Sequence, residues 1–146
     1  MNNQLERHGI SQRALDIADK VEDFVRTQVV PFEGDPRCGA HGPSDDLGNE
    51  LKVLARSAGV MTPHILEDGG HLTQRETAAV LIRSGLSPLG PLACHTCAPD
   101  EGNMFLLDKV ASPKLKDRFL PRMIDGSMRS AFFMTEPAEE GGAGSD

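Results

Sequence analysis

Residues 129–146 read RSAFFMTEPAEEGGAGSD, and this stretch decides how the chain is divided into domains. The segment from Arg129 to Thr135 is short, apolar and rich in phenylalanine, which is typical of a β-strand. The residues after Pro137 have the glycine-rich composition of a loop. A single strand has no partner for its hydrogen-bond ladder. We therefore expect residues 128–146 to be the truncated start of a β domain.

Upstream of this stretch, apolar residues recur at three- and four-residue spacing, which predicts amphipathic helices. Thr73 and Glu76 have the spacing of a capping box, and Gly85 is expected to end that helix in the left-handed conformation. Ser11 and Asp100 are expected to cap two other helices. The predicted helices span residues 11–30, 44–59, 73–85, 100–110 and 112–126, with a weakly helical segment over 86–98 and irregular loops over 31–46 and 61–72.

The composition excludes several classes of function. The 146 residues include 15 lysines and arginines and 22 aspartates and glutamates, and the net charge of −7 is spread along the chain. Nucleic-acid binding needs clustered basic side chains, which this sequence lacks. Apolar runs such as Ala78 to Ile82 are far shorter than the roughly 18 to 20 residues that cross a bilayer, so we expect no membrane span. The N-terminus lacks the layout of a secretory signal, which indicates a cytoplasmic protein with reduced cysteines.

Cysteine and histidine spacing raises the possibility of a metal site. Cys38 and His41 form C-x2-H, while Cys94 and Cys97 form C-x2-C, and together they could supply four ligands for a tetrahedral zinc. The two pairs are far apart in the sequence, with helices predicted between them. Burial as small core residues is the favoured interpretation of Cys94 and Cys97, because free cysteine is among the most buried residue types. We therefore predict no metal and keep a zinc-stapled domain as an alternative.

The segment FFMTEP at residues 132–137, followed by GAGSD at residues 142–146, resembles the flavin-binding acyl-CoA dehydrogenases, whose T-E-P and G-[ST]-D signature closes the first strand of the central β domain. The sequence from Ala98 to Met104 and the helix that begins at Ser112-Pro113 also resemble the last helices of that family's N-terminal domain. The similarity is strongest to the branch that contains the aminoglycoside-kinase-linked relatives. It implies a mainly α fold, with an N-terminal helical-bundle domain over residues 1–127 and the first strand of a β domain at the C-terminus.

This resemblance implies an FAD-dependent oxidoreductase that acts on the CH–CH group of acyl-CoA thioesters. The residues that match the family's flavin contacts are Phe132, Met134 and Thr135, and those that match its thioester contacts are Gly144 and Ser145. The loop between Pro137 and Gly142 is longer than the family's compact form. The family's catalytic base is a glutamate in a C-terminal helical domain, outside this chain, so no catalytic residue is predicted here. Glu136 belongs to the T-E-P turn and is expected to be structural.

The same resemblance implies the partners of a full-length enzyme. These are the acyl-CoA substrate, an electron-transferring flavoprotein and further copies of the chain in a homo-oligomer. The segment from His95 to Ala98, together with Asn103, is a candidate lining of the acyl pocket. The alternative from a different class is a truncated, non-catalytic helical interaction module.

Overall fold

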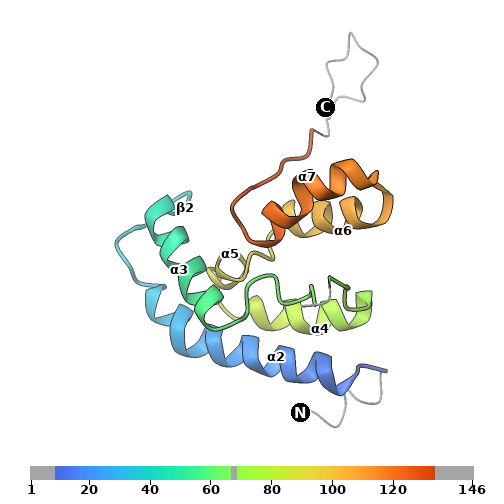
Figure 1. Ribbon diagram of the computed structural model, residues 1–146. Helices are drawn as coiled ribbons and strands as arrows, with labels where there is room; N and C mark the ends of the chain where they lie inside the picture. Colours follow the sequence, from blue (N-terminus) through green and yellow to red (C-terminus); the bar gives the residue numbers. More distant parts are fainter. Residues whose placement is uncertain (1–8, 67–68, 134–146) are drawn as a thin grey trace, which may run out of the picture.

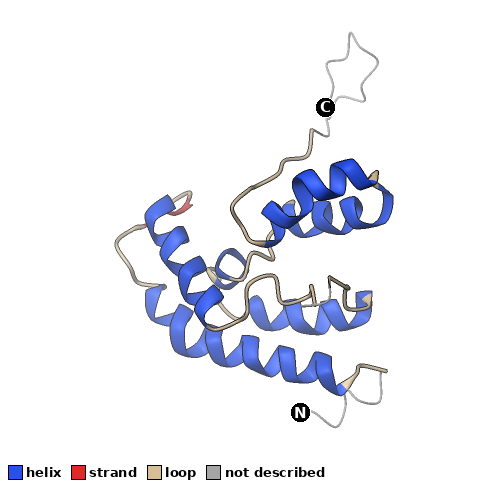
Figure 2. Cartoon of the chain, viewed as in Figure 1, coloured by secondary structure: helices blue, strands red, loops and turns tan. Residues whose placement is uncertain are grey.

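The structure is a computed structural model that describes residues 9–66 and 69–133 (Figure 1). It is mainly helical, as Figure 2 shows, which confirms the predicted fold class. The α-helices are α2 (Gln12–Phe24), α3 (Asp45–Ser57), α4 (Gln74–Ser84), α5 (Gly90–Ala93), α6 (Asp100–Val110) and α7 (Pro113–Ile124). Within these ranges, every helix is too short or too polar to cross a lipid bilayer.

The first long helix continues past α2 in two less regular turns. A π-helical turn, η2 (Val25–Val29), and a 3₁₀ turn, η3 (Val30–Phe32), follow α2 without a break. Ser11 caps the start of α2, and its hydroxyl accepts a hydrogen bond from the Ala14 amide at 3.3 Å. Pro31 was expected to stop the helix, yet it lies inside η3. It is tolerated there because proline fits the first turn of a helix, where its missing N–H costs no hydrogen bond.

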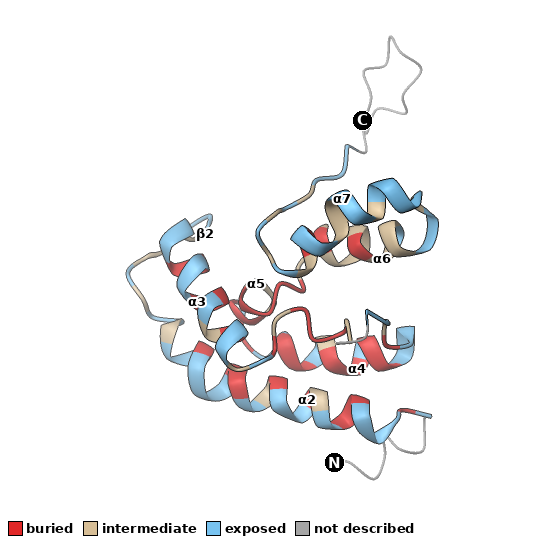
Figure 3. Cartoon of the chain, viewed as in Figure 1, coloured by how far each residue is buried: buried red, intermediate tan, exposed pale blue. Residues whose placement is uncertain are grey.

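Helices α2, α3, α4 and α5 enclose the main core (Figure 1). Helix α2 packs along α4, and α3 packs against α5. Figure 3 shows buried residues on the sides of α2 and α4 that face each other and along α5. The largest fully buried side chains of this core are apolar: Leu15, Val21, Phe24, Val25, Val29, Leu47, Leu51, Val60 and Val80. Burial of these apolar side chains therefore holds the four helices together.

Helices α6 and α7 form a separate helical hairpin beside the other four helices (Figure 1). Met104 on α6 and Met123 on α7 are buried, at 0% and 2% exposed, but do not belong to the main core cluster. The hairpin is tied back by hydrogen bonds to the last turn of α7. Thr62 Oγ1 donates to the Ile124 carbonyl at 3.2 Å, and Arg56 Nη2 donates to the Asp125 carbonyl at 2.8 Å. The turn before α4 and the end of α3 thus fix the place where the chain leaves α7.

Three further local predictions were wrong. The loop over residues 31–46 contains two short antiparallel strands, β1 (Cys38–Gly39) and β2 (Gly42–Pro43). Gly42, the first residue of β2, has a positive φ of 108°, which glycine adopts readily. Gly85 ends α4 with φ −73°, so it is not left-handed. Asp100 does not cap α6, since Pro99 holds the N-cap position and the Asp100 carboxylate is used elsewhere.

The predicted strand over residues 129–135 is only partly within the described chain. Residues 129–133 have no strand assignment there, in keeping with the need of a strand for a hydrogen-bonded neighbour. Residues 134–146 lie outside the described residues. The domain boundary at residue 128 therefore stays a prediction.

The capping box at the start of α4 is confirmed and does more than cap its own helix. The Glu76 carboxylate accepts from the Thr73 amide and hydroxyl at 3.0 and 2.8 Å, and from the Ser11 amide at the start of α2 at 3.1 Å. Hydrogen bonds from Ser11 and Thr73 lower the pKa of Glu76 to about 2. One carboxylate therefore joins the first turns of two neighbouring helices.

Replacing Glu76 by alanine is expected to lower the free energy of unfolding by about 2 kcal/mol, because the part-buried donors of Ser11 and Thr73 lose their acceptor. Urea unfolding followed by circular dichroism measures the change. Ser44→Ala is the matched control, because its hydroxyl caps only the Leu47 amide of α3, and it should cost about 1 kcal/mol. Equal losses in the two variants would contradict the joining role of Glu76.

Candidate functional site

The residues predicted to hold flavin and thioester lie at and beyond the C-terminal edge of the described chain. Phe132 is described and is half exposed, at 54%, while the neighbouring Phe133 is 96% exposed. Met134, Thr135, Gly144 and Ser145 lie outside the described residues. The structure therefore positions the chain that leads into the predicted site, and the contacts of these four residues stay predictions.

A hollow of about 340 Å³ lies beside this lead-in segment, between α6 and α7. Apolar side chains of both helices form most of its wall, and three polar side chains lie at the end nearest the exit from α7. The polar residues are Asn103, Arg129 and Ser130, and the apolar residues are Leu106, Leu107, Phe119, Met123 and Met128. An apolar hollow with a few polar groups at one end is typical of small-molecule sites.

The predicted pocket lining from His95 to Ala98 is not brought together by the described structure. His95 and Thr96 are buried at 3% and 6% exposed, whereas Ala98 is exposed. The Thr96 hydroxyl pairs with the Ser84 hydroxyl at 3.0 Å, and it also donates to the Pro91 carbonyl at 3.4 Å. These bonds show that Thr96 joins α4 to α5. Among the predicted lining residues, Asn103 does face the hollow, because α6 presents it toward Ser130.

A buried carboxylate organises the polar end of the hollow. Asp100 is 2% exposed, and its Oδ1 accepts from both the backbone N–H and the hydroxyl of Ser130, at 2.6 and 2.7 Å. Asn103 Nδ2 donates to the Ser130 hydroxyl oxygen at 2.8 Å, and Arg129 Nε lies 3.7 Å from Asp100 Oδ2. Sequence reasoning placed Asp100 as a helix cap and missed Ser130. The D-x-x-N spacing, which puts both polar side chains on one face of α6, was the available signal.

Other titratable groups interact electrostatically with Asp100. Burial, followed by the charges of Arg129 and Arg56, lowers the pKa of Lys52, and the charge of Asp100 opposes them. Burial, followed by the charge of Lys52, lowers the pKa of His95. His95 Nε2 is buried and has no hydrogen-bond partner within the described part of the chain. Both shifts disfavour the charged form of the side chain.

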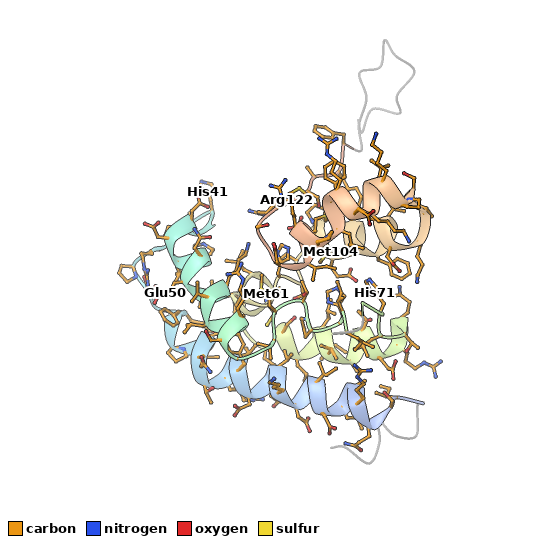
Figure 4. The ribbon with its side chains drawn as sticks, viewed as in Figure 1. His41, Glu50, Met61, His71, Met104 and Arg122 are labelled. Carbon is orange, nitrogen blue, oxygen red and sulfur yellow. The ribbon has the colours of Figure 1, made fainter. Side chains whose placement is uncertain are left out.

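His64, in the connection between α3 and α4, is a second buried histidine. His64 is 1% exposed, and both of its ring nitrogens are without a partner among the described residues. Burial lowers its pKa to about 4, with smaller contributions from His71 and His95. His71, labelled in Figure 4, lies 6.0 Å from His64 and 6.0 Å from Phe105, measured between ring centroids. This group packs α6 against the turn before α4.

The described structure does not assemble the alternative zinc site. Within residues 9–66 and 69–133, no group of three or more histidine, cysteine, aspartate or glutamate side chains is placed to hold a metal. All three cysteines are free thiols. The Cys38 thiol approaches the Phe32 carbonyl at 3.7 Å, and burial raises the pKa of Cys94 to about 12. Burial thus disfavours the thiolate form of Cys94.

Comparisons with known proteins agree with the fold and with the resemblance in the sequence. The chain is 33% identical to "Probable acyl-CoA dehydrogenase FadE2" of Mycobacterium tuberculosis over 88% of its length, which is 33% of that protein. It is 30% identical to "Acyl-CoA dehydrogenase family member 10" of Mus musculus over 88% of its length and 13% of that protein. No family model matches the chain.

A solved structure shares both the sequence and the helical arrangement. This protein of Mycobacterium abscessus, assigned to the acyl-CoA dehydrogenases, matches 88% of the chain with a TM-score of 0.67 and 32% identity. The match covers 35% of the solved chain, so the present chain spans about a third of the length of that protein and of the mycobacterial relative. By sequence and by helical fold, the chain belongs to the acyl-CoA dehydrogenase family.

Proposed function

We propose that this chain forms the helical wall and the flavin-contacting segment of an FAD-dependent acyl-CoA dehydrogenase. The observation that carries the proposal is the match to the Mycobacterium abscessus structure, in which the same helical arrangement recurs at 32% identity. The T-E-P and G-S-D residues at the end of the chain support it. The reaction would remove hydrogen from the CH–CH group next to the thioester.

The described residues that lead into the proposed flavin segment fit an isoalloxazine. This ring is large, flat and apolar, and its edge carries hydrogen-bonding atoms. Phe132 offers an exposed aromatic face beside the mainly apolar hollow between α6 and α7. Met134 would contribute main-chain contacts, and the Thr135 hydroxyl would bond the redox-active edge of the ring. When bound, FAD would supply a two-electron acceptor for hydride from the substrate.

The acyl-CoA substrate would bind near the same C-terminal end of the chain. Gly144 would allow close approach of the thioester arm, and Ser145 would bond to it. Asn103 at the hollow would form part of the wall around the acyl group. The family resemblance implies that the general base that removes the proton next to the thioester would be a glutamate of a C-terminal helical domain, outside this chain. An electron-transferring flavoprotein, a homo-oligomer and a cytoplasmic setting belong to the same proposal for the whole enzyme.

The isolated 146 residues are expected to bind FAD weakly and to turn over no acyl-CoA, since the proposed base and most of the proposed flavin cradle would lie in the part of the longer relatives that this chain does not match. Two measurements check this prediction: FAD titration followed by flavin fluorescence, and reduction of an artificial electron acceptor in the presence of acyl-CoA. Reduction of the acceptor by the isolated chain in the presence of acyl-CoA would contradict the proposal that the base lies outside these residues.

A further inference from the structure

The exit from α7 is held by a side chain from a different helix. After α7 ends at Ile124, Gly126 turns the chain with φ 70°, and residues 128–133 run back past α6. The Met128 amide still bonds the Arg122 carbonyl at 3.0 Å. Beyond Met128, the described hydrogen bonds that hold this segment to the helices are those of Ser130. Ser130 therefore decides the direction in which the chain continues toward Phe132.

Asp100 accepts two of these hydrogen bonds, and its side chain is buried. Its carboxylate is almost fully buried, and one oxygen accepts both hydrogen bonds from Ser130. The residue is the first of α6, where the positive end of the helix dipole favours a negative charge. A carboxylate that only capped the N-terminus of α6 would bond the backbone amides of that helix and could stay exposed to solvent. Asp100 is instead buried, and it bonds a residue thirty positions away in the sequence.

Asn103, three residues after Asp100 on α6, adds a further hydrogen bond to Ser130, and we call these contacts of Asp100 and Asn103 with Ser130 the clamp. Its side chain donates to the Ser130 hydroxyl oxygen, so that this hydroxyl donates to Asp100 and accepts from Asn103. A hydroxyl with both roles fixed cannot rotate to a second geometry. Arg129, next to it, places its guanidinium toward the other oxygen of Asp100 at 3.7 Å. The first turn of α6 thus fixes both the backbone and the side chain at one point of the exit segment.

We propose that Asp100 is a positioning residue: its buried carboxylate holds Ser130 and thereby sets where Phe132 lies relative to the proposed flavin site. The link to flavin rests on the proposed function. The clamp itself is a property of the described chain and is measured without any cofactor, so its failure and the failure of the proposed function are distinguishable.

Amide hydrogen exchange of the whole 146-residue chain tests the clamp. In Asp100→Ala, the Ser130 amide is expected to exchange about tenfold faster or more, as befits the loss of a hydrogen bond to a charged acceptor. Asp100→Asn keeps an acceptor oxygen and should restore most of the protection. Glu101→Gln removes the neighbouring charge in the same helical turn and should leave the exchange unchanged, because the described hydrogen bonds of Ser130 are to Asp100 and Asn103.

A fluorescence measurement reads the position of the segment directly. The chain has no tryptophan, so Phe132→Trp introduces a single reporter two residues after the clamp. Adding Asp100→Ala to it should lower the emission anisotropy of this tryptophan, and Asp100→Asn should return it. If Asp100→Ala does not fold, Ser130→Ala replaces it in the anisotropy measurement alone, because that variant removes both hydroxyl bonds and keeps the amide bond. Unchanged exchange and anisotropy, or acceleration spread evenly over α6 and α7, would overturn the positioning role.

Discussion

Replacing Gly90 by alanine is expected to lower the free energy of unfolding by about 3 kcal/mol, the upper range for overpacking a core. A Cβ built on Gly90 would lie 1.9 Å from the Ser84 carbonyl oxygen and 3.4 Å from Val25 Cγ2. Ser84 ends α4 and Gly90 begins α5, so both sides of the clash are backbone. Backbone cannot move aside as a flexible side chain could, so the connection between α4 and α5 would have to shift.

Gly102 provides the matched control for this prediction. It lies within α6, and a Cβ there would meet nothing within 4 Å. Gly102→Ala should therefore raise the free energy of unfolding by about 0.5 to 1 kcal/mol, because glycine loses more backbone entropy in a helix than alanine does. Urea unfolding of the two variants should show shifts of opposite sign. A Gly90→Ala chain as stable as the parent would mean that α4 and α5 are not joined as described.

The second large effect is the dependence of stability on pH, and it comes from His64. Its ring is 1% exposed, and its pKa is lowered from 6.5 to about 4, mainly by burial. Between these two values the unfolded chain binds a proton that the folded chain excludes, so stability rises with pH. This contribution is complete above pH 6.5 and is lost as the pH falls toward 4. The shift corresponds to about 3 kcal/mol at 1.36 kcal/mol for each pKa unit.

Urea unfolding at a series of pH values between 4.5 and 7 measures this contribution. The lowered pKa of His95 acts with the same sign and adds to the slope. His64→Leu should be more stable than the parent chain at pH 5, with a clearly flatter pH profile, because it removes two unpartnered nitrogens as well as the titration. His41→Gln, at an exposed position, should leave the profile of the parent chain intact. A parent chain whose stability is constant from pH 7 to 4.5 would contradict the burial of His64.

Much of the helical fold was predictable because its determinants are local. The capping box of Thr73 and Glu76 is written in four consecutive residues, and the structure forms it as expected. Apolar spacing likewise places α2 and α3 along the core. The extension of α2 through Pro31 was missed, since only the packing of that turn decides whether proline ends a helix or begins a new one.

The candidate site depended on contacts that local patterns do not encode. Asp100 stands where a helix cap is expected, yet its carboxylate bonds Ser130, thirty residues later. His64 lies in the connection between α3 and α4, and the fold there buries it almost completely. Distant pairing gives Asp100 its structural role and burial gives His64 its lowered pKa, and neither can be deduced from neighbouring residues in the sequence.

A domain exchange tests most directly whether this chain is the helical and flavin-contacting part of an acyl-CoA dehydrogenase. In it, residues 1–146 replace the matched third of the Mycobacterium abscessus relative, and the flavin absorption of the purified protein is recorded before and after acyl-CoA is added. We expect a yellow protein whose flavin is bleached by acyl-CoA, and a weaker flavin complex when Thr135→Val is introduced. A folded exchange protein, with the circular dichroism of the parent, that carries no flavin or is not bleached by acyl-CoA would contradict the account.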